Sequence, residues 1–385
     1  MKENILVVHG GGPTAVINAS LYGVIKEAGR HGVIGKVYGA GGGVDGIFRE
    51  EFIDFGQQPA KQIELLPGTP ASAIGTSRTK LLPEDYSKIV EILRQNHIKY
   101  LLFNGGNGSM DTCGKIHKLA AEYGIQVLGI PKTIDNDIAV TDHCPGYGSA
   151  ARYLAVSVAE AAQDVKAMPI HVCIIEAMGR NAGWIAAASV LARKGSGDGP
   201  HLIYLPERPF NVGEFLEDVG RLHRDLGGVV VVASEGLVDK DKKPVVDPVL
   251  TKGRDVYFGD IGAHLAMLVI KELGIKARSE KPGILGRASA TLQSPVDREE
   301  AIRVGEFAVR SLLEGQSGFM VGYKRISGEP YRCETILIHI TEVMLNEKKL
   351  PEYYINRRGN DVTGEFVEYC RPLVGGPLPE YTHFR

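Results

Sequence analysis

The chain has 385 residues, 44% hydrophobic and 23% charged, enough for two or three domains at roughly 150 residues each. Its 44 basic and 46 acidic side chains nearly balance, which argues against a nucleic-acid partner because such surfaces carry a basic excess. No apolar stretch approaches the roughly 18 residues of a membrane span or resembles a signal peptide, so we expect a soluble, cytoplasmic protein without a membrane partner.

Cysteine and glycine usage narrow the class of protein further. Five cysteines, an odd number without C-x-x-C spacing, indicate neither a disulfide framework nor a structural zinc site. The 48 glycines exceed the roughly 27 of average composition, and many follow apolar runs. Because glycine at a strand end lets the backbone approach an anion, this placement favours a phosphate-binding enzyme.

Short apolar runs alternate with helical stretches, the pattern of a mainly parallel α/β sheet. We expect strands at 5–8, 100–103, 127–130, 172–177 and 229–233. Helices are expected at 15–29, 83–97, 109–123, 147–166, 181–194, 211–226, 258–273 and 297–314. Ligands of open α/β sheets bind outside the carboxyl ends of the strands, so the loops after the five strands are candidates for converging sites.

Two of these loops are rich in glycine. Gly10-Gly11-Gly12 and Gly105-Gly106-Asn107-Gly108-Ser109 each lie between a strand and a helix, where backbone N–H groups and the positive end of the helix can bind an anion. Two such loops can hold the two ends of a polyphosphate. A tight turn for the first loop and a simple helix cap at Ser109 are the alternatives.

A third loop, Pro131–Asp137, places two carboxylates two residues apart beside Lys132. Alternate residues of an extended segment point the same way, so Asp135 and Asp137 would share a face. One carboxylate could take a proton from a hydroxyl while the other helps to hold Mg²⁺. In isolation the loop fits a solvated turn better, but beside two glycine loops it favours phosphoryl transfer.

Four short strings resemble, in order and spacing, the phosphofructokinases that use ATP or pyrophosphate: Gly105–Ser109, Thr133–Asp137, Met178–Arg180 and Ser234–Gly236. The resemblance runs from about residue 4 to 315. It implies an α/β fold of two Rossmann-like lobes with mainly parallel sheets, an active site in the cleft between them, and a homodimer or homotetramer. The donor lobe would comprise 1–140 plus about 258–312, and the acceptor lobe 141–257 plus about 313–385.

The resemblance also implies roles for individual residues. Asp135 would be the general base, and the further catalytic residues would be Thr133, Asp137, Arg180 and Lys132. The donor would be bound by Gly12, Arg78, Gly106, Asn107, Gly108 and Ser109. The sugar would be bound by Met178, Gly179, Arg180, Glu235, Lys281, Arg287 and His171, and Mg²⁺ by Asn107, Asp135 and Asp137. Arg78 makes independent sense, because a guanidinium can neutralise charge on the transferred phosphoryl group.

Two residues point to different donors. Gly108 stands where, in this family, glycine leaves room for the nucleotide and aspartate accompanies pyrophosphate, whereas Lys132 is common in the pyrophosphate users. We give Gly108 more weight, because the missing volume is required to admit a nucleotide. We therefore expect Mg²⁺-dependent transfer from ATP, with pyrophosphate as the alternative. Asn107 replaces the usual acid, so the metal would depend more on Asp135 and Asp137.

The acceptor side departs from the family pattern, because two arginines that usually bind a 6-phosphate are replaced by His171 and Ala290. Losing two charge-assisted hydrogen bonds of ~1.5–3 kcal/mol each could weaken binding by roughly 10² to 10⁴-fold. The first hypothesis is fructose 6-phosphate, phosphorylated on its 1-hydroxyl, with Arg287, Lys281 and His171 as candidates for a rebuilt phosphate pocket. The second is an unphosphorylated sugar or polyol such as an inositol. A non-catalytic nucleotide-binding relative or a Rossmann dehydrogenase is the remote alternative.

Overall fold

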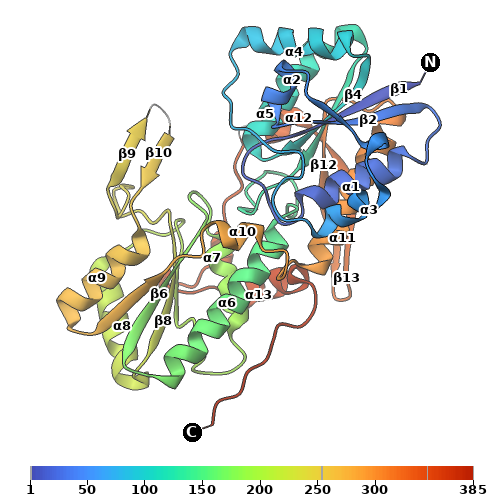
Figure 1. Ribbon diagram of the computed structural model, residues 1–385. Helices are drawn as coiled ribbons and strands as arrows, with labels where there is room; N and C mark the ends of the chain where they lie inside the picture. The colour runs from blue at the N-terminus through green and yellow to red at the C-terminus, as the bar shows by residue number, and fades with distance from the viewer. Residues whose placement is uncertain (1, 253–254, 345, 385) are drawn as a thin grey trace. The chain divides into compact units, whose positions relative to one another are not determined.

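The computed structural model describes residues 2–252, 255–344 and 346–384. Contacts divide the chain into two compact units. Unit 1 consists of Met1–Ser149 and Arg287–Lys348, and unit 2 of Ala150–Gly286 and Lys349–Arg385. Each unit has its own sheet flanked by helices (Figure 1). The predicted α/β fold of two lobes with mainly parallel sheets is therefore confirmed.

Unit 1 is built on a seven-stranded sheet in the order β13-β12-β5-β4-β1-β2-β3. The strands are β1 (Glu3–His9), β2 (Ile34–Ala40), β3 (Phe52–Asp54), β4 (Ile98–Gly105), β5 (Gln126–Pro131), β12 (Phe319–Gly328) and β13 (Tyr331–His339). Pairing is parallel from β2 through β1, β4 and β5 to β12, and antiparallel only to the edge strands β3 and β13. The carboxyl ends of β1, β4 and β5 therefore lie side by side.

Helices cover both faces of this sheet (Figure 1). The longer ones are α1 (Ile17–Ala28), α4 (Pro83–Gln95), α5 (Asn107–Ala120) and α11 (Pro295–Leu313), and the shorter ones α2 (Val44–Phe48), α3 (Ala60–Leu65) and α12 (Ile340–Val343). Ile5 and Val7 pack in the core with α1 and α11, whereas Leu6 and Val8 pack with α4 and α5. Burial on both faces explains why the strands appear in the sequence as continuous apolar runs.

Unit 2 has a four-stranded, all-parallel sheet in the order β11-β6-β8-β7. Its strands are β6 (His171–Ala177), β7 (Leu202–Tyr204), β8 (Val229–Ser234) and β11 (Lys276–Glu280), and a separate hairpin is formed by β9 (Pro248–Lys252) and β10 (Asp255–Phe258). Its helices are α7 (Trp184–Ala188), α8 (Val212–Leu226), α9 (Ile261–Leu273) and α13 (Gly364–Cys370). Two helices cross the boundaries between the units: α6 (Tyr147–Ala167), which continues into unit 2 after Ser149, and α10 (Ile284–Ala288), which enters unit 1 at Arg287. Phe215 of α8 and Leu265 of α9 pack with Val172 and Ile174 of β6.

The five predicted strands are all present, and all eight predicted helices begin within about three residues of the expected positions, but one of them is much shorter than predicted. The exception is 181–194, where only Trp184–Ala188 is α-helical and Ser189–Ala192 is a 3-10 turn. The Ser189 hydroxyl donates to the Ala186 carbonyl at 2.6 Å, a local bond that competes with the helical pattern. Among the described helices, none is long and apolar enough to cross a membrane.

The lobe boundaries differ from those expected. Residues 258–286 belong to unit 2 rather than to the first lobe, because β11 pairs with β6. Residues 313–348 belong to unit 1, because β12 pairs with β5. Strand pairing between distant segments decides both assignments, and no local pattern in the sequence reports which strands will pair.

Candidate active site

Three loops are joined by backbone hydrogen bonds at the carboxyl ends of β1, β4 and β5. The Gly10 N–H donates to the Asn104 carbonyl and the Lys132 N–H to the Gly105 carbonyl, both at 2.9 Å. A Cβ atom at Gly105 would collide with the side chain of Ser109, so only glycine lets α5 begin this close to the strand. The two predicted glycine loops and the acidic loop are thus neighbours.

The side chain of Lys132 lies beneath the first glycine loop. Lys132 is 3% exposed, and its Nζ donates to the Gly12 carbonyl at 2.6 Å. Burial lowers the pKa of Lys132 to about 8; Asp135 opposes this shift, and the charges of Arg287 and Arg78 add to it. The lysine is therefore charged at neutral pH, and its charge faces the loop predicted to bind the donor.

Two guanidinium groups also lie close to Gly12. A Cβ atom at this position would be 2.7 Å from Arg287 Nη1 and 3.4 Å from Arg78 Nη2. Burial, together with the charge of Arg78, lowers the pKa of Arg287, and its Nε has no hydrogen-bond partner among the described residues. Arg78, Lys132 and Arg287 form what we call the cation cluster. Because like charges repel, this cluster is suited to an anion.

The position of Arg287 differs from the predicted one. The sequence placed Arg287 with the acceptor, whereas the structure places it in unit 1 beside Gly12, among the residues predicted for the donor. Spacing along the chain could not reveal this, because Arg287 opens the second chain segment of unit 1 and its neighbour in space is some 275 positions away in sequence.

The two aspartates of the third loop have different environments. Asn107 Nδ2 donates to Asp137 Oδ2 at 2.9 Å, and the Thr133 hydroxyl donates to Asp137 Oδ1 at 3.2 Å. The Asp135 N–H in turn donates to the Thr133 hydroxyl at 3.0 Å. Burial raises the pKa of Asp137, although the Thr133 hydrogen bond opposes this shift. The Asn107 amide thus replaces what would be a repulsive contact between two acids.

Asn107 and Asp137 also fit a divalent cation. The Asn107 Oδ1 is buried and has no hydrogen-bond partner among the described residues. The Nδ2 of the same amide donates to the Asp137 carboxylate, whose pKa is raised by burial. Oxygen atoms of amides and carboxylates are the ligands that Mg²⁺ and Ca²⁺ prefer, so this pair is chemically suited to the predicted metal.

Asn136, between the two aspartates, has a structural role that the sequence reasoning missed. Its φ of 53° lies in the left-handed region, which asparagine tolerates better than most residues. Its side chain is fully buried and its Oδ1 accepts from the Cys144 N–H at 3.0 Å. An asparagine flanked by two acids in a short polar loop was the available signal.

In unit 2, the residues predicted to bind the sugar cluster at the carboxyl ends of β6 and β8. The Ser234 hydroxyl donates to the Gly179 carbonyl at 2.6 Å, and the Gly179 N–H donates to Glu235 Oε1 at 3.3 Å. Gly179 has a φ of 122°, which explains glycine in the string Met178-Gly179-Arg180. The two predicted strings of this unit are therefore direct neighbours.

Lys281 and His171 were also predicted to bind the sugar, but neither provides an unpaired positive charge beside Gly179 and Glu235. Lys281 forms an ion pair with buried Glu176 and lies 3.9 Å from Asp260. Burial disfavours the charge of Lys281, but pairing with Glu176 raises its pKa. His171 is buried at the opposite end of β6, so the structure does not bring it to the others. Glu176 was missed, although an acid within the apolar run 172–177 was a visible signal.

We expect Gly105→Ala to destabilise unit 1, because the added methyl group must displace Ser109 and the start of α5. The loss should be about 1–3 kcal/mol in the free energy of unfolding, typical of overpacking, measured by urea denaturation. Gly108→Ala is the matched control, since a Cβ atom there meets nothing within 4 Å. Equal stability of the two variants would contradict the close approach described for Gly105.

Comparison with known proteins provides independent information. The family model described as "Phosphofructokinase" matches residues 4–312. The pyrophosphate–fructose 6-phosphate 1-phosphotransferase of Xanthomonas campestris pv. campestris (strain B100) is 42% identical over 98% of this chain and 92% of its own. A sulfofructose kinase of Alkalicoccus urumqiensis is 33% identical over 92% of each. The crystal structure of a pyrophosphate-dependent phosphofructokinase from Marinobacter aquaeolei has a TM-score of 0.89 at 39% identity, covering 99% and 94% of the two chains.

Proposed function

Because this chain belongs to the phosphofructokinase family, we propose that it transfers a phosphoryl group from pyrophosphate to a sugar hydroxyl, with fructose 6-phosphate as the first candidate acceptor. The predicted family and the predicted phosphotransferase class are confirmed. The observation that carries the proposal is the cation cluster around Gly12, next to the loop of Asp135. It combines charge neutralisation for a phosphate donor with a base for an alcohol.

We propose pyrophosphate, the alternative to the expected ATP, as the donor. The relatives from Xanthomonas and Marinobacter are named as pyrophosphate-dependent. The room at Gly108, where a Cβ atom would meet nothing within 4 Å, admits a nucleotide but does not select one. The cation cluster favours a compact donor, because pyrophosphate concentrates its negative charge on two adjacent phosphoryl groups.

In the proposed reaction, Asp135 accepts the proton of the acceptor hydroxyl as its oxygen bonds to phosphorus. The bond from that phosphorus to the bridging oxygen of pyrophosphate breaks, and orthophosphate leaves. Arg78, Lys132 and Arg287 neutralise charge on the phosphoryl oxygens throughout. Asp137 and Asn107 Oδ1 would hold Mg²⁺, which when bound would neutralise further phosphate charge. The predicted Mg²⁺ and the predicted homo-oligomer stay predictions.

A second candidate acceptor, an unphosphorylated sugar or polyol, is favoured by one specific observation. Among the described residues of unit 2, Lys281 is the cation that remains at the predicted 6-phosphate positions, and it is already neutralised by Glu176 with Asp260 nearby. A phosphate dianion would have to compete with these carboxylates for the ammonium.

Asp135→Asn should lower kcat/KM by the ~10² to 10⁴-fold typical of a missing general base, while binding of imidodiphosphate, a non-transferable analogue of pyrophosphate, persists in calorimetry. Turnover is measured by ³¹P NMR. Glu299→Gln, an exposed acid on α11, is the matched control and should leave both quantities unchanged. Full activity of the Asn variant would refute the proposed base.

Arg287→Gln should raise the KM for pyrophosphate by roughly 10 to 150-fold, the equivalent of one charge-assisted hydrogen bond, with a smaller effect on the KM for the acceptor. Initial rates with each substrate varied in turn make the measurement, and Arg332→Gln, exposed on β13, is the control. A rise confined to the KM for the acceptor would return Arg287 to the acceptor site that the sequence predicted.

The two acceptors are separated by assaying the wild-type protein with pyrophosphate and fructose 6-phosphate, fructose or myo-inositol, with ATP as a parallel donor. We expect turnover with fructose 6-phosphate and pyrophosphate, because the relatives named above share most of the chain. Turnover of the unphosphorylated alcohols alone would establish the second candidate. Phosphoryl transfer from neither donor to any acceptor would sink the proposed function.

A further inference from the structure

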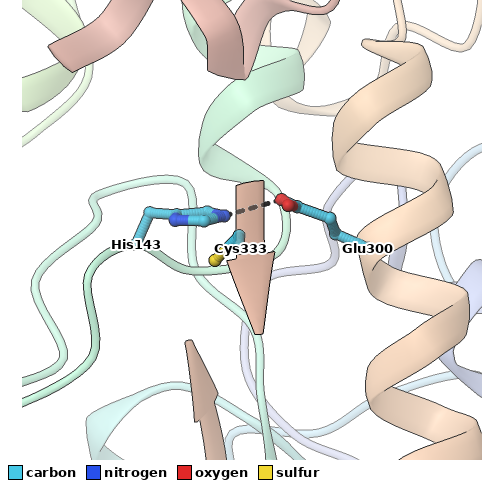
Figure 2. A group of neighbouring side chains, drawn as sticks. All are labelled: His143, Glu300 and Cys333. Carbon is cyan, nitrogen blue, oxygen red and sulfur yellow. Dashed lines mark hydrogen bonds and ion pairs between the residues drawn. The ribbon is translucent and has the colours of Figure 1, made fainter. Parts of the chain in front are cut away.

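A buried ion-pair network lies in unit 1, outside the residues assigned so far. The ring of His143 has Nδ1 2.9 Å from Asp142 Oδ2 and Nε2 2.7 Å from Glu300 Oε2. His143 and Glu300 are only 2% and 1% exposed. The ring also stacks on Tyr323, with centroids 4.5 Å apart. Figure 2 shows His143 and Glu300 facing each other, with Cys333 beside them.

Each element around the ring contributes charged or titratable groups. Glu300 also accepts from the Tyr331 hydroxyl at 2.9 Å and pairs with Arg303 at 3.2 Å. Asp142 pairs with Arg325 at 3.1 Å. Among the described residues, the charged and titratable groups around the ring are Asp142 and Cys144 in the loop, Asp297, Glu300 and Arg303 on α11, Tyr323 and Arg325 on β12, Tyr331 and Cys333 on β13, and Lys348, whose Nζ donates to the Asp142 carbonyl at 2.8 Å.

The same side chains could be considered as a metal site, since ligand atoms of His143, Glu300 and Cys333 all lie within 4.8 Å of one another. Charge balance argues against it. Two carboxylates already face the imidazolium and the guanidinium groups of Arg303 and Arg325. A cation would add charge between two guanidiniums and would have to displace the proton that Nε2 shares with Glu300. An imidazolium between two carboxylates gives each ring nitrogen an acceptor without a metal ion.

The protonation of the ring supports this interpretation. Burial alone would disfavour the charge, but Glu300 and Asp142 outweigh it and raise the pKa of His143 to about 9. Both carboxylates respond in the opposite sense: burial disfavours their charge, yet His143 lowers the pKa of each. His143, Asp142 and Glu300 are therefore all charged at neutral pH.

We call His143 with its partners Asp142 and Glu300 the clamp. One hydrogen bond links the segment of the clamp to the Asp135–Asp137 turn. Cys144, the residue after His143, donates its N–H to Asn136 Oδ1 at 3.0 Å, and Asn136 is the buried left-handed residue between Asp135 and Asp137. At the next residue of the turn, the Asp137 carbonyl accepts from the Lys348 N–H at 2.7 Å. Displacing His143 would therefore shift the backbone that supports Asn136.

We propose that His143, held between Asp142 and Glu300, is a positioning residue that fixes the Asp135–Asp137 turn through the Cys144–Asn136 hydrogen bond. The proposal rests on the proposed function, because it matters for catalysis only if Asp135 is the base. A displacement of the base by a fraction of an ångström is costly, since catalytic groups must lie within hydrogen-bond reach of the proton they accept.

The test compares His143→Gln with Asp142→Asn, a milder variant that keeps the contact to Glu300, and with His339→Gln as an exposed control on β13. We expect His143→Gln to lower kcat about tenfold or more at pH 7 with a less than about twofold change in the KM for pyrophosphate. Asp142→Asn should have a smaller effect in the same direction, and His339→Gln none. An unchanged kcat with only a lower melting temperature would reduce the clamp to a purely structural role and overturn the proposal.

The pH dependence provides a second readout. Since the pKa of His143 is raised from 6.5 to about 9 in the folded protein, its contribution to stability is fully present below about pH 6.5 and is lost as the pH rises through about 9. The melting temperature of the wild type should fall over this window more steeply than that of His143→Gln. Parallel curves would contradict a charged His143.

Two measurements do not depend on turnover, so they separate failure of the clamp from failure of the proposed function. ¹⁵N NMR should show both ring nitrogens of His143 protonated at pH 7.5, and hydrogen exchange at the Cys144 amide should be faster in His143→Gln. A neutral ring, or unchanged exchange, would refute the clamp. Tight binding of one Zn²⁺ that Cys333→Ser abolishes would establish the metal site instead.

Discussion

Strand β4 hydrogen-bonds to β1 along one edge and to β5 along the other, both in parallel. This pairing decides where the chemically important loops can lie, because three strands with both faces buried cannot change register without moving apolar side chains out of the core. Their carboxyl ends therefore deliver Gly12, Ser109 and Asp135 to the same edge of the sheet. The bonds from Gly10 N–H to Asn104 and from Lys132 N–H to Gly105 complete the arrangement.

Charge is distributed differently in the two units. In unit 1, Arg78, Lys132 and Arg287 surround Gly12, and their mutual repulsion makes an anionic substrate the natural counterion. In unit 2, Lys281 is balanced by Glu176 and Asp260. The proposed phosphate donor would therefore meet cations in unit 1, whereas a phosphate on the acceptor would depend on groups other than Lys281.

The ion-pair network of His143 is linked by a hydrogen bond to the Asp135–Asp137 turn. Residues that bind or activate a substrate need supporting residues that restrict their backbone, since catalytic geometry tolerates little displacement. Asn136 has the left-handed conformation between the two aspartates, and the Cys144 N–H holds its side chain. His143, the residue before Cys144, is itself held by Asp142 and Glu300.

Local residue patterns were sufficient to predict strands β1, β4, β5, β6 and β8, most of the helices, the loops at the carboxyl ends of these strands and the family, because each depends on residues close together in the chain. Each of the four strings that identified the family is likewise a short run of neighbouring residues. The position of Arg287 beside Gly12, the neutralisation of Lys281 by Glu176 and the assignment of 258–286 to unit 2 were not predictable. Each depends on contacts between residues far apart in the sequence, and the folded chain alone creates those contacts and the electrostatic environment that they produce.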